Sequence, residues 1–178
     1  MWFTKFIFHK LMGWKIEGSF DPAVKKSVVI IVPHTHWNDF TVGAYARRIL
    51  KREINFVAKK ELFKWPMGAY FRWMGGTPLD RTSGQNKVEA IAAIFDQKEE
   101  FQLAIAPEGT RKKVDTWKTG FYYIAKAANV PVIAVAFDYG KKTVFVHPPY
   151  DLTGNFEQDL AALKAKYDGV VGKVPEYT

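Results

Sequence analysis

The chain has 178 residues, of which 48% are hydrophobic and 25% charged. This length and composition predict one globular domain over residues 1–178 and exclude an intrinsically disordered chain. The absence of cysteine excludes disulfide frameworks, zinc ribbons and thiol nucleophiles, and a net charge of +8 favours an anionic partner.

The first fifteen residues, MWFTKFIFHKLMGWK, carry three lysines, one histidine and no acid. Phe3, Ile7, Leu11 and Trp14 recur at near-helical spacing, which predicts an amphipathic helix over 1–15 that lies on a membrane surface. A helix docked on the protein's own core is the alternative. No window reaches the roughly 20 apolar residues of a membrane span, so we expect peripheral binding.

The rest of the chain predicts strands that alternate with helices. Strands are expected at 28–32, 55–58, 101–106, 130–137 and 143–147, and helices at 37–50, 62–74, 84–99, 120–129 and 155–167. The first strand is β-branched without alternation, as in a strand buried on both faces of a parallel sheet. The pattern therefore predicts an α/β domain with a largely parallel central sheet flanked by helices, in which the last two strands form a hairpin.

The loop PHTHWNDF, residues 33–40, follows the first buried strand, where α/β proteins place active-site loops. His34 and Asp39 are the candidate catalytic pair, because Asp39 can hold the proton of one imidazole nitrogen and leave the other as a general base. Five residues apart on an ideal helix, the two side chains would diverge by about 140°. A contact therefore requires His34 on the loop and Asp39 in the first helical turns.

Two other interpretations fit the same loop. One is a helix cap beside an ordinary loop histidine. The other is a metal loop of His34, His36 and Asp39, as in a metallohydrolase. We expect no metal, because a catalytic metal needs supported protein ligands and the only other histidines are His9 and His147. No serine or cysteine stands in a nucleophile motif, which favours direct transfer to a substrate hydroxyl over a covalent acyl-enzyme.

Two further loops carry residue types that bind anions. GGTPLDR, residues 75–81, is a glycine-rich turn ending in Arg81, whose planar fork suits phosphate. APEGTRKK, residues 106–113, follows a strand and combines a carboxylate, a hydroxyl and a basic cluster. A surface turn and a solvated loop acid are the alternatives. The strand VPVIAVA, residues 130–136, carries no chemistry of its own.

In chain order, these four blocks resemble the glycerolipid acyltransferase family that includes 1-acylglycerol-3-phosphate acyltransferases. His34 and Asp39 match its His-x-x-x-x-Asp motif, Gly76 and Arg81 its glycine-rich turn, residues 107–111 its Pro-Glu-Gly-Thr-Arg motif, and 130–133 its Val-Pro-Val-Ile strand. The resemblance covers most of the chain and implies a glycerol-3-phosphate acyltransferase-like fold with His34 and Asp39 as the catalytic dyad. It also implies a group of residues that bind the substrate: Gly76, Arg81, Glu108, Gly109, Thr110 and Arg111.

The resemblance further implies transfer of a fatty acyl group from acyl-CoA or acyl carrier protein to the hydroxyl of a lysophospholipid, with 1-acylglycerol-3-phosphate as the first acceptor and phosphatidic acid as product. It implies no cofactor and no nucleic-acid partner, and a peripheral place on the inner, cytoplasmic face of a bacterial cell membrane. An ornithine-type lipid is an alternative acceptor. A noncatalytic module that binds anionic lipid would also explain the charge of +8. The oligomeric state is not predicted.

Overall fold

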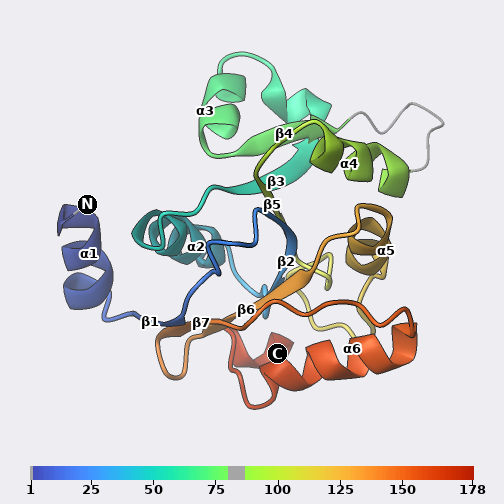
Figure 1. The fold of residues 1–178 in the computed structure, drawn as a ribbon. Coiled ribbons are helices and arrows are strands. Elements are labelled where there is room, and N and C mark those ends of the chain that lie inside the picture. The colour runs from blue at the N-terminus through green and yellow to red at the C-terminus, as the bar shows by residue number, and fades with distance from the viewer. Residues whose placement is uncertain (1, 80–86) are drawn as a thin grey trace.

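A seven-stranded sheet lies at the centre of the computed structural model, which describes residues 2–79 and 87–178. Its strands run in the order β1-β7-β6-β2-β5-β3-β4 (Figure 1). Their bounds are β1 Lys15–Gly18, β2 Lys26–Val32, β3 Ile54–Lys59, β4 Gly76–Leu79, β5 Phe101–Ile105, β6 Val132–Asp138 and β7 Thr143–Val146. The predicted largely parallel sheet is confirmed, since β2 pairs in parallel with both β5 and β6, and β3 with both β4 and β5. The predicted hairpin is the antiparallel pair β6 and β7.

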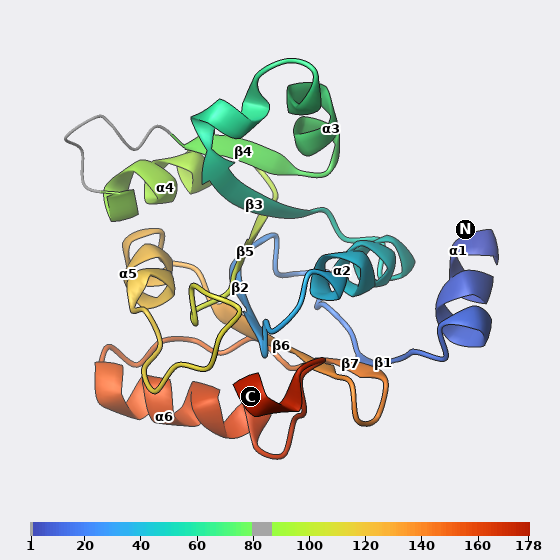
Figure 2. The same cartoon turned by 180° about the vertical axis from the view of Figure 1, so that it is seen from behind.

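Helices cover both faces of this sheet. Their bounds are α1 Trp2–Phe6, η1 Ile7–Leu11, α2 Asn38–Ile49, η2 Lys60–Phe63, α3 Met67–Trp73, α4 Lys87–Asp96, α5 Gly120–Ala127, α6 Phe156–Lys164, η3 Ala165–Tyr167 and η4 Pro175–Tyr177. Helix α2 lies on one face with α1 beside it, whereas α4, α5 and α6 lie on the other (Figures 1 and 2). No helix of the described residues is long and apolar enough to cross a membrane.

The central strand β2 is buried on both faces, as its unbroken β-branched sequence predicts. Val28 and Ile30 join the apolar cluster under α4, α5 and α6, while Val29 joins the cluster under α2. Successive side chains of a strand point to opposite faces, so each face receives a different set. The loops that follow β2, β5 and β6 leave the same edge of the sheet, because the three strands are parallel.

The N-terminal helix differs from its prediction. It ends at Leu11, and its last turn is π-helical, with the Met12 N–H bonded to the Ile7 carbonyl. Trp14, the last member of the predicted apolar stripe, therefore lies outside the helix and is buried. Phe8, outside that stripe, is fully buried, whereas Phe3 and Leu11 are 67% and 69% exposed. The helix therefore docks on the core and still presents apolar side chains outward.

The segment after β3 also differs from its prediction. The expected helix over 62–74 is divided into η2 and α3, because Pro66 has no N–H to donate to a continuous helix. The expected turn at Gly75-Gly76 shrinks to Gly75, which has a φ of +87°, and Gly76 already begins β4. Strands β1 and β4 were not predicted, because each has four residues without a β-branched run.

Candidate active site

The structure brings His34 and Asp39 into contact. His34 lies on the loop after β2, and Asp39 lies in the first turn of α2. The ring Nδ1 of His34 is 3.0 Å from Oδ2 of Asp39. The Asp39 side chain is 1% exposed, whereas the His34 ring is 27% exposed. The carboxylate is thus enclosed and the imidazole reaches the surface of a cavity.

Three donors hold the Asp39 carboxylate. Oδ2 accepts from the His36 N–H at 2.9 Å as well as facing His34, and Oδ1 accepts from the Tyr139 hydroxyl at 2.7 Å. Burial raises the pKa of the Asp39 carboxyl, but the bonds from His34, His36 and Tyr139 outweigh it, so the pKa lies below its ordinary value. Asp39 is therefore an anion at neutral pH. This charge favours the His34 tautomer that carries its proton on Nδ1.

Tyr139 is a site residue that the sequence reasoning missed. It is the first residue after β6, which neighbours β2 in the sheet. Burial and the bond to Asp39 both raise the pKa of Tyr139, so its hydroxyl stays protonated and donates. Its place at the carboxyl end of a strand beside β2 was the signal that could have found it.

Glu108 joins the loop after β5 to the catalytic loop. Its side chain is buried, and Oε2 accepts from the backbone N–H of His34 at 2.7 Å. Burial raises the pKa of Glu108, the bond from the His34 N–H lowers it in part, and the net pKa stays above the ordinary value. Glu108 thereby positions the backbone of the histidine that Asp39 orients.

The other predicted substrate residues are placed differently. Gly109, Thr110 and Arg111 follow Glu108 and are exposed. Gly109 has a φ of +65°, and a Cβ there would lie 2.6 Å from the Lys118 side chain. Gly76 is packed in β4, where a Cβ would lie 2.9 Å from the Phe63 ring. Arg81 lies outside the described residues.

His36 takes no part in a metal cluster. Its Nδ1 accepts from the backbone N–H of Asn38 at 3.1 Å, at the start of α2. Among residues 2–79 and 87–178, no three His, Cys, Asp or Glu side chains gather in a way that could hold a metal ion. The metallohydrolase interpretation therefore finds no ligand set in the described chain.

An apolar cavity of about 380 Å³ has His34 and Asp39 among its lining residues. It follows α2 between that helix and the sheet, where Gly43 and Ala44 leave room on the helix surface. The strands supply branched and small apolar side chains together with Phe56 and Phe137, and α3 adds Phe71. Its walls carry hardly any polar groups beyond the dyad, Asn55 and Arg47. The apolar lining suits a hydrocarbon group, and the His34 ring is within the same wall.

The chain is similar in sequence to known acyltransferases. The model of the Acyltransferase family matches residues 15–138. The chain is 24% identical, over 183 aligned positions, to the 1-acyl-sn-glycerol-3-phosphate acyltransferase of Haemophilus influenzae, covering 92% of this chain and 75% of that protein. Proteins of the same name from Bacillus subtilis and Salmonella typhimurium are each 29% identical over 70% of this chain. The matches span 62% and 53% of those two relatives, so the chain corresponds to only part of their length.

The fold is shared with a solved structure. The crystal structure of the 1-acyl-sn-glycerophosphate (LPA) acyltransferase PlsC from Thermotoga maritima superposes with a TM-score of 0.64 and 23% sequence identity. The superposition covers 94% of this chain and 75% of the other. This likeness confirms the predicted α/β fold class.

Proposed function

This chain belongs to the Acyltransferase family, and from that premise we propose that it transfers a fatty acyl group from a thioester donor to the free hydroxyl of 1-acylglycerol-3-phosphate, giving phosphatidic acid. The observation that carries the proposal is the His34 and Asp39 pair in the wall of an apolar cavity. The names of the bacterial relatives support the acceptor, and an ornithine-type lipid is the second candidate.

In the proposed reaction, Asp39 holds the proton on Nδ1 of His34, and Nε2 takes the proton of the acceptor hydroxyl. The hydroxyl oxygen attacks the thioester carbonyl and forms a tetrahedral intermediate. Its collapse breaks the carbon–sulfur bond, and the leaving thiolate takes the proton from Nε2. The products are an ester and a free thiol, so the reaction balances without a cofactor, and we propose none.

The donor's acyl chain is proposed to occupy the apolar cavity. A thioester carbonyl placed beside His34 leaves its hydrocarbon chain pointing along α2. Each methylene buried there is worth about 0.8 kcal/mol. Acyl-CoA and acyl carrier protein present the same thioester, so either carrier fits this arrangement.

The acceptor's phosphate is proposed to meet the basic residues around the catalytic loop. Arg111, Lys112 and Lys113 are exposed on the loop that Glu108 ties to His34. Gly109 and Thr110 lie between Glu108 and this cluster. Through the family resemblance, Gly76 and Arg81 are proposed to complete the site. Arginine forks and clustered lysines suit a phosphate monoester.

A membrane surface is the proposed place of the reaction. Trp2, Phe3 and Phe6 are 78%, 67% and 41% exposed on α1, and Lys5 and Lys10 flank them. The buried Phe8 holds the same helix on the protein. Aromatic and basic side chains together favour the interface of an anionic bilayer. We propose a peripheral position on the inner face of a bacterial cell membrane.

The test measures acyl transfer from labelled acyl-CoA and acyl carrier protein to a panel of lysolipids in the presence of a metal chelator. We expect product with wild-type protein and a loss of about 10²- to 10⁴-fold with His34→Ala, since this is the usual contribution of a general base. The matched control is His36→Asn, which can still accept from Asn38 and should keep its turnover.

Each contrary outcome has a distinct meaning. Wild-type turnover in His34→Ala would contradict the dyad. Loss of wild-type activity in the chelator, restored by added metal, would favour the metallohydrolase interpretation. No product on any lysolipid, with vesicle binding retained, would favour a noncatalytic lipid-binding module.

A further inference from the structure

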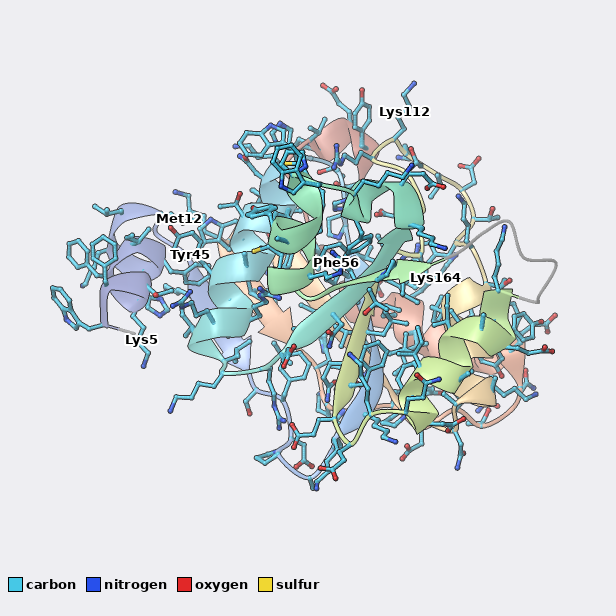
Figure 3. All side chains as sticks on the ribbon, turned by 90° about the horizontal axis from the view of Figure 1, so that it is seen from above. Lys5, Met12, Tyr45, Phe56, Lys112 and Lys164 are labelled. Atoms are coloured by element: carbon cyan, nitrogen blue, oxygen red, sulfur yellow. The ribbon has the colours of Figure 1, made fainter. Side chains whose placement is uncertain are left out.

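The C-terminal segment, residues 170–178, lies against the catalytic loop. It follows α6 and η3 and includes the short helix η4. Figure 3 shows this end of the chain on the same edge of the molecule as Lys112, which lies on the loop after β5. Glu108 of that loop bonds to His34, so the segment lies on the edge that carries the catalytic groups. Residues 170–178 are called the strap.

The strap contacts the catalytic loop at Thr35. Thr35 is buried, and its Oγ1 accepts from the backbone N–H of Val174 at 3.1 Å. Thr35 stands between His34, the proposed base, and His36, whose N–H donates to Asp39 at 2.9 Å. The strap therefore holds the residue that joins these two histidines.

A close approach at Gly172 accompanies this bond. A Cβ at Gly172 would lie 2.9 Å from both Cγ2 and Oγ1 of Thr35, and 2.8 Å from Oγ1 of Thr178. The same Thr178 oxygen accepts from the Gly172 N–H at 2.9 Å. The φ of Gly172 does not lie in the left-handed region, so the lack of space and not the backbone conformation requires glycine here. A larger residue has to displace Thr35 or the strap.

The strap also contacts Tyr139, which donates to Asp39. The Val171 carbonyl accepts from the Tyr139 N–H at 2.8 Å. The Nζ of Lys173 lies 5.7 Å from the centroid of the Tyr139 ring, within the range of a cation–π contact. The hydroxyl of this tyrosine donates to Oδ1 of Asp39 at 2.7 Å. Neighbouring residues of one segment thus contact both the loop and the tyrosine that hold the Asp39 carboxylate.

We propose that the strap positions the His34 and Asp39 pair through Thr35 and Tyr139, and that Gly172 and Thr35 are positioning residues for acyl transfer. The inference rests on the proposed function. A displacement of Thr35 moves the peptide groups on both of its sides, and these belong to His34 and His36. Misplacement of a catalytic group by about 1 Å can cost about 10²-fold in rate.

The experiment compares acyl transfer by wild-type protein and by Gly172→Ala, at a temperature well below the Tm of both. The added methyl group has to displace Thr35 or the strap. We expect kcat to fall by about 10- to 100-fold. The KM values for donor and acceptor should stay within about twofold, because no residue of the strap lines the apolar cavity and the loss concerns the chemical step.

A second change at Thr35 tests whether the loss passes through this residue. Thr35→Ser removes the Cγ2 that the new methyl group meets and keeps Oγ1 as the acceptor for the Val174 N–H. Combined with Gly172→Ala, it should restore kcat about three- to tenfold over Gly172→Ala alone, as expected of two residues in contact. A residue that acts only on stability would show no such recovery of kcat.

The matched control is Gly120→Ala. A Cβ at Gly120 would meet no atom within 4 Å, so the same chemical change is made in open space and should leave kcat and Tm unchanged. If Gly172→Ala fails to fold, Thr35→Val is used. Valine has nearly the same shape as threonine and removes only the acceptor for the Val174 N–H. We expect kcat to fall in the same direction, by up to about tenfold.

The outcomes separate this inference from the proposed function. No transfer by the wild-type protein would overturn the proposed function itself. Transfer by wild type with an unchanged kcat in Gly172→Ala or Thr35→Val, even at a lowered Tm, would overturn the positioning role alone and leave the strap a stabilising segment. A fall in kcat that Thr35→Ser does not reverse in any part would also overturn it, because the loss would not pass through Thr35.

Discussion

Two buried aspartates on different helices show how similar surroundings can serve different purposes. Asp39 in α2 and Asp159 in α6 are 2% and 0% exposed. Each accepts from tyrosine hydroxyls and backbone N–H groups. In each case burial raises the pKa, and the hydrogen bonds outweigh it and lower the pKa below the ordinary value. Both are therefore buried anions whose oxygens are satisfied.

The two aspartates differ because Asp39 contacts the imidazole of His34 and lines the apolar cavity. Asp159 is surrounded by the hydroxyls of Tyr122, Tyr150 and Thr153 and by nearby backbone N–H groups. Asp39 faces an imidazole that opens on an apolar cavity. A buried carboxylate with a lowered pKa thus does not identify a site by itself. The base beside it and the room for a substrate do.

The largest expected effect follows from replacing Asp39. Asp39→Asn removes the negative charge that favours the proton on Nδ1 of His34 and that stabilises the imidazolium formed when Nε2 takes a proton. We expect kcat to fall by about 10²- to 10⁴-fold. Steady-state kinetics of acyl transfer measure this effect. Turnover within a few-fold of wild type would contradict the orienting role of Asp39.

Asp159→Asn is the matched change at the buried aspartate of α6. One oxygen is replaced by an NH₂ group that cannot accept from the surrounding donors, which costs about 1–3 kcal/mol. At about 2–4 °C per kcal/mol for a chain of this size, Tm should fall by about 2–12 °C. Calorimetry measures this shift, and kcat should stay within about twofold. A large loss of kcat at unchanged Tm would remove the distinction between the two aspartates.

Smaller effects are expected from the tyrosines that donate to the two aspartates, Tyr139 and Tyr150. Tyr139→Phe removes one donor from Asp39 and leaves the bond to His34, so we expect kcat to fall by up to about tenfold. Tyr150→Phe removes one tyrosine donor from Asp159, and should lower Tm while leaving kcat unchanged. Paired kinetics and thermal unfolding check both variants. Equal kcat values in the two would show that Tyr139 has no influence on the dyad.

The smallest expected effect is in the pH dependence of stability. A carboxyl whose folded pKa is lowered stabilises the fold above its unfolded pKa of about 3.9 and loses that contribution as the pH falls through the folded pKa. Asp159→Asn lacks this contribution, so the Tm difference from wild type should shrink as the pH falls below about 4. Thermal unfolding between neutral and acidic pH measures it. A difference that grows on acidification would contradict the lowered pKa.

For Glu108, the pH dependence of the Tm difference between variant and wild type should have a different origin, because the pKa of its carboxyl is raised instead of lowered. Its pKa is raised, so the folded state favours the protonated form, and this contribution is lost as the pH rises through the folded pKa. Glu108→Gln keeps an acceptor for the His34 N–H. Its Tm relative to wild type should therefore be higher at neutral pH than at acidic pH. The same unfolding series tests it, and a reversed order would contradict the shift.

The sequence alone determined the fold class and showed the four motifs of the acyltransferase resemblance in their order. The β-branched run of β2, the helix that starts near Asp39 and the parallel β-α alternation are local patterns, and each element formed close to its expected place. Helices α4 and α6 formed within the predicted ranges 84–99 and 155–167. His34 and Asp39 are five residues apart, so a loop and a helix start were enough to anticipate their contact.

Only the tertiary structure decided what surrounds that pair. Tyr139 reaches Asp39 from 100 residues away, and Glu108 reaches His34 from 74 residues away. The N-terminal helix ended at Leu11 instead of residue 15, and its packing through Phe8 depends on α2 and the sheet. The apolar cavity arises where α2, the sheet and α3 meet. Periodicity describes neighbours along the chain, whereas hydrogen bonds and cavities between distant segments exist only after packing brings them together.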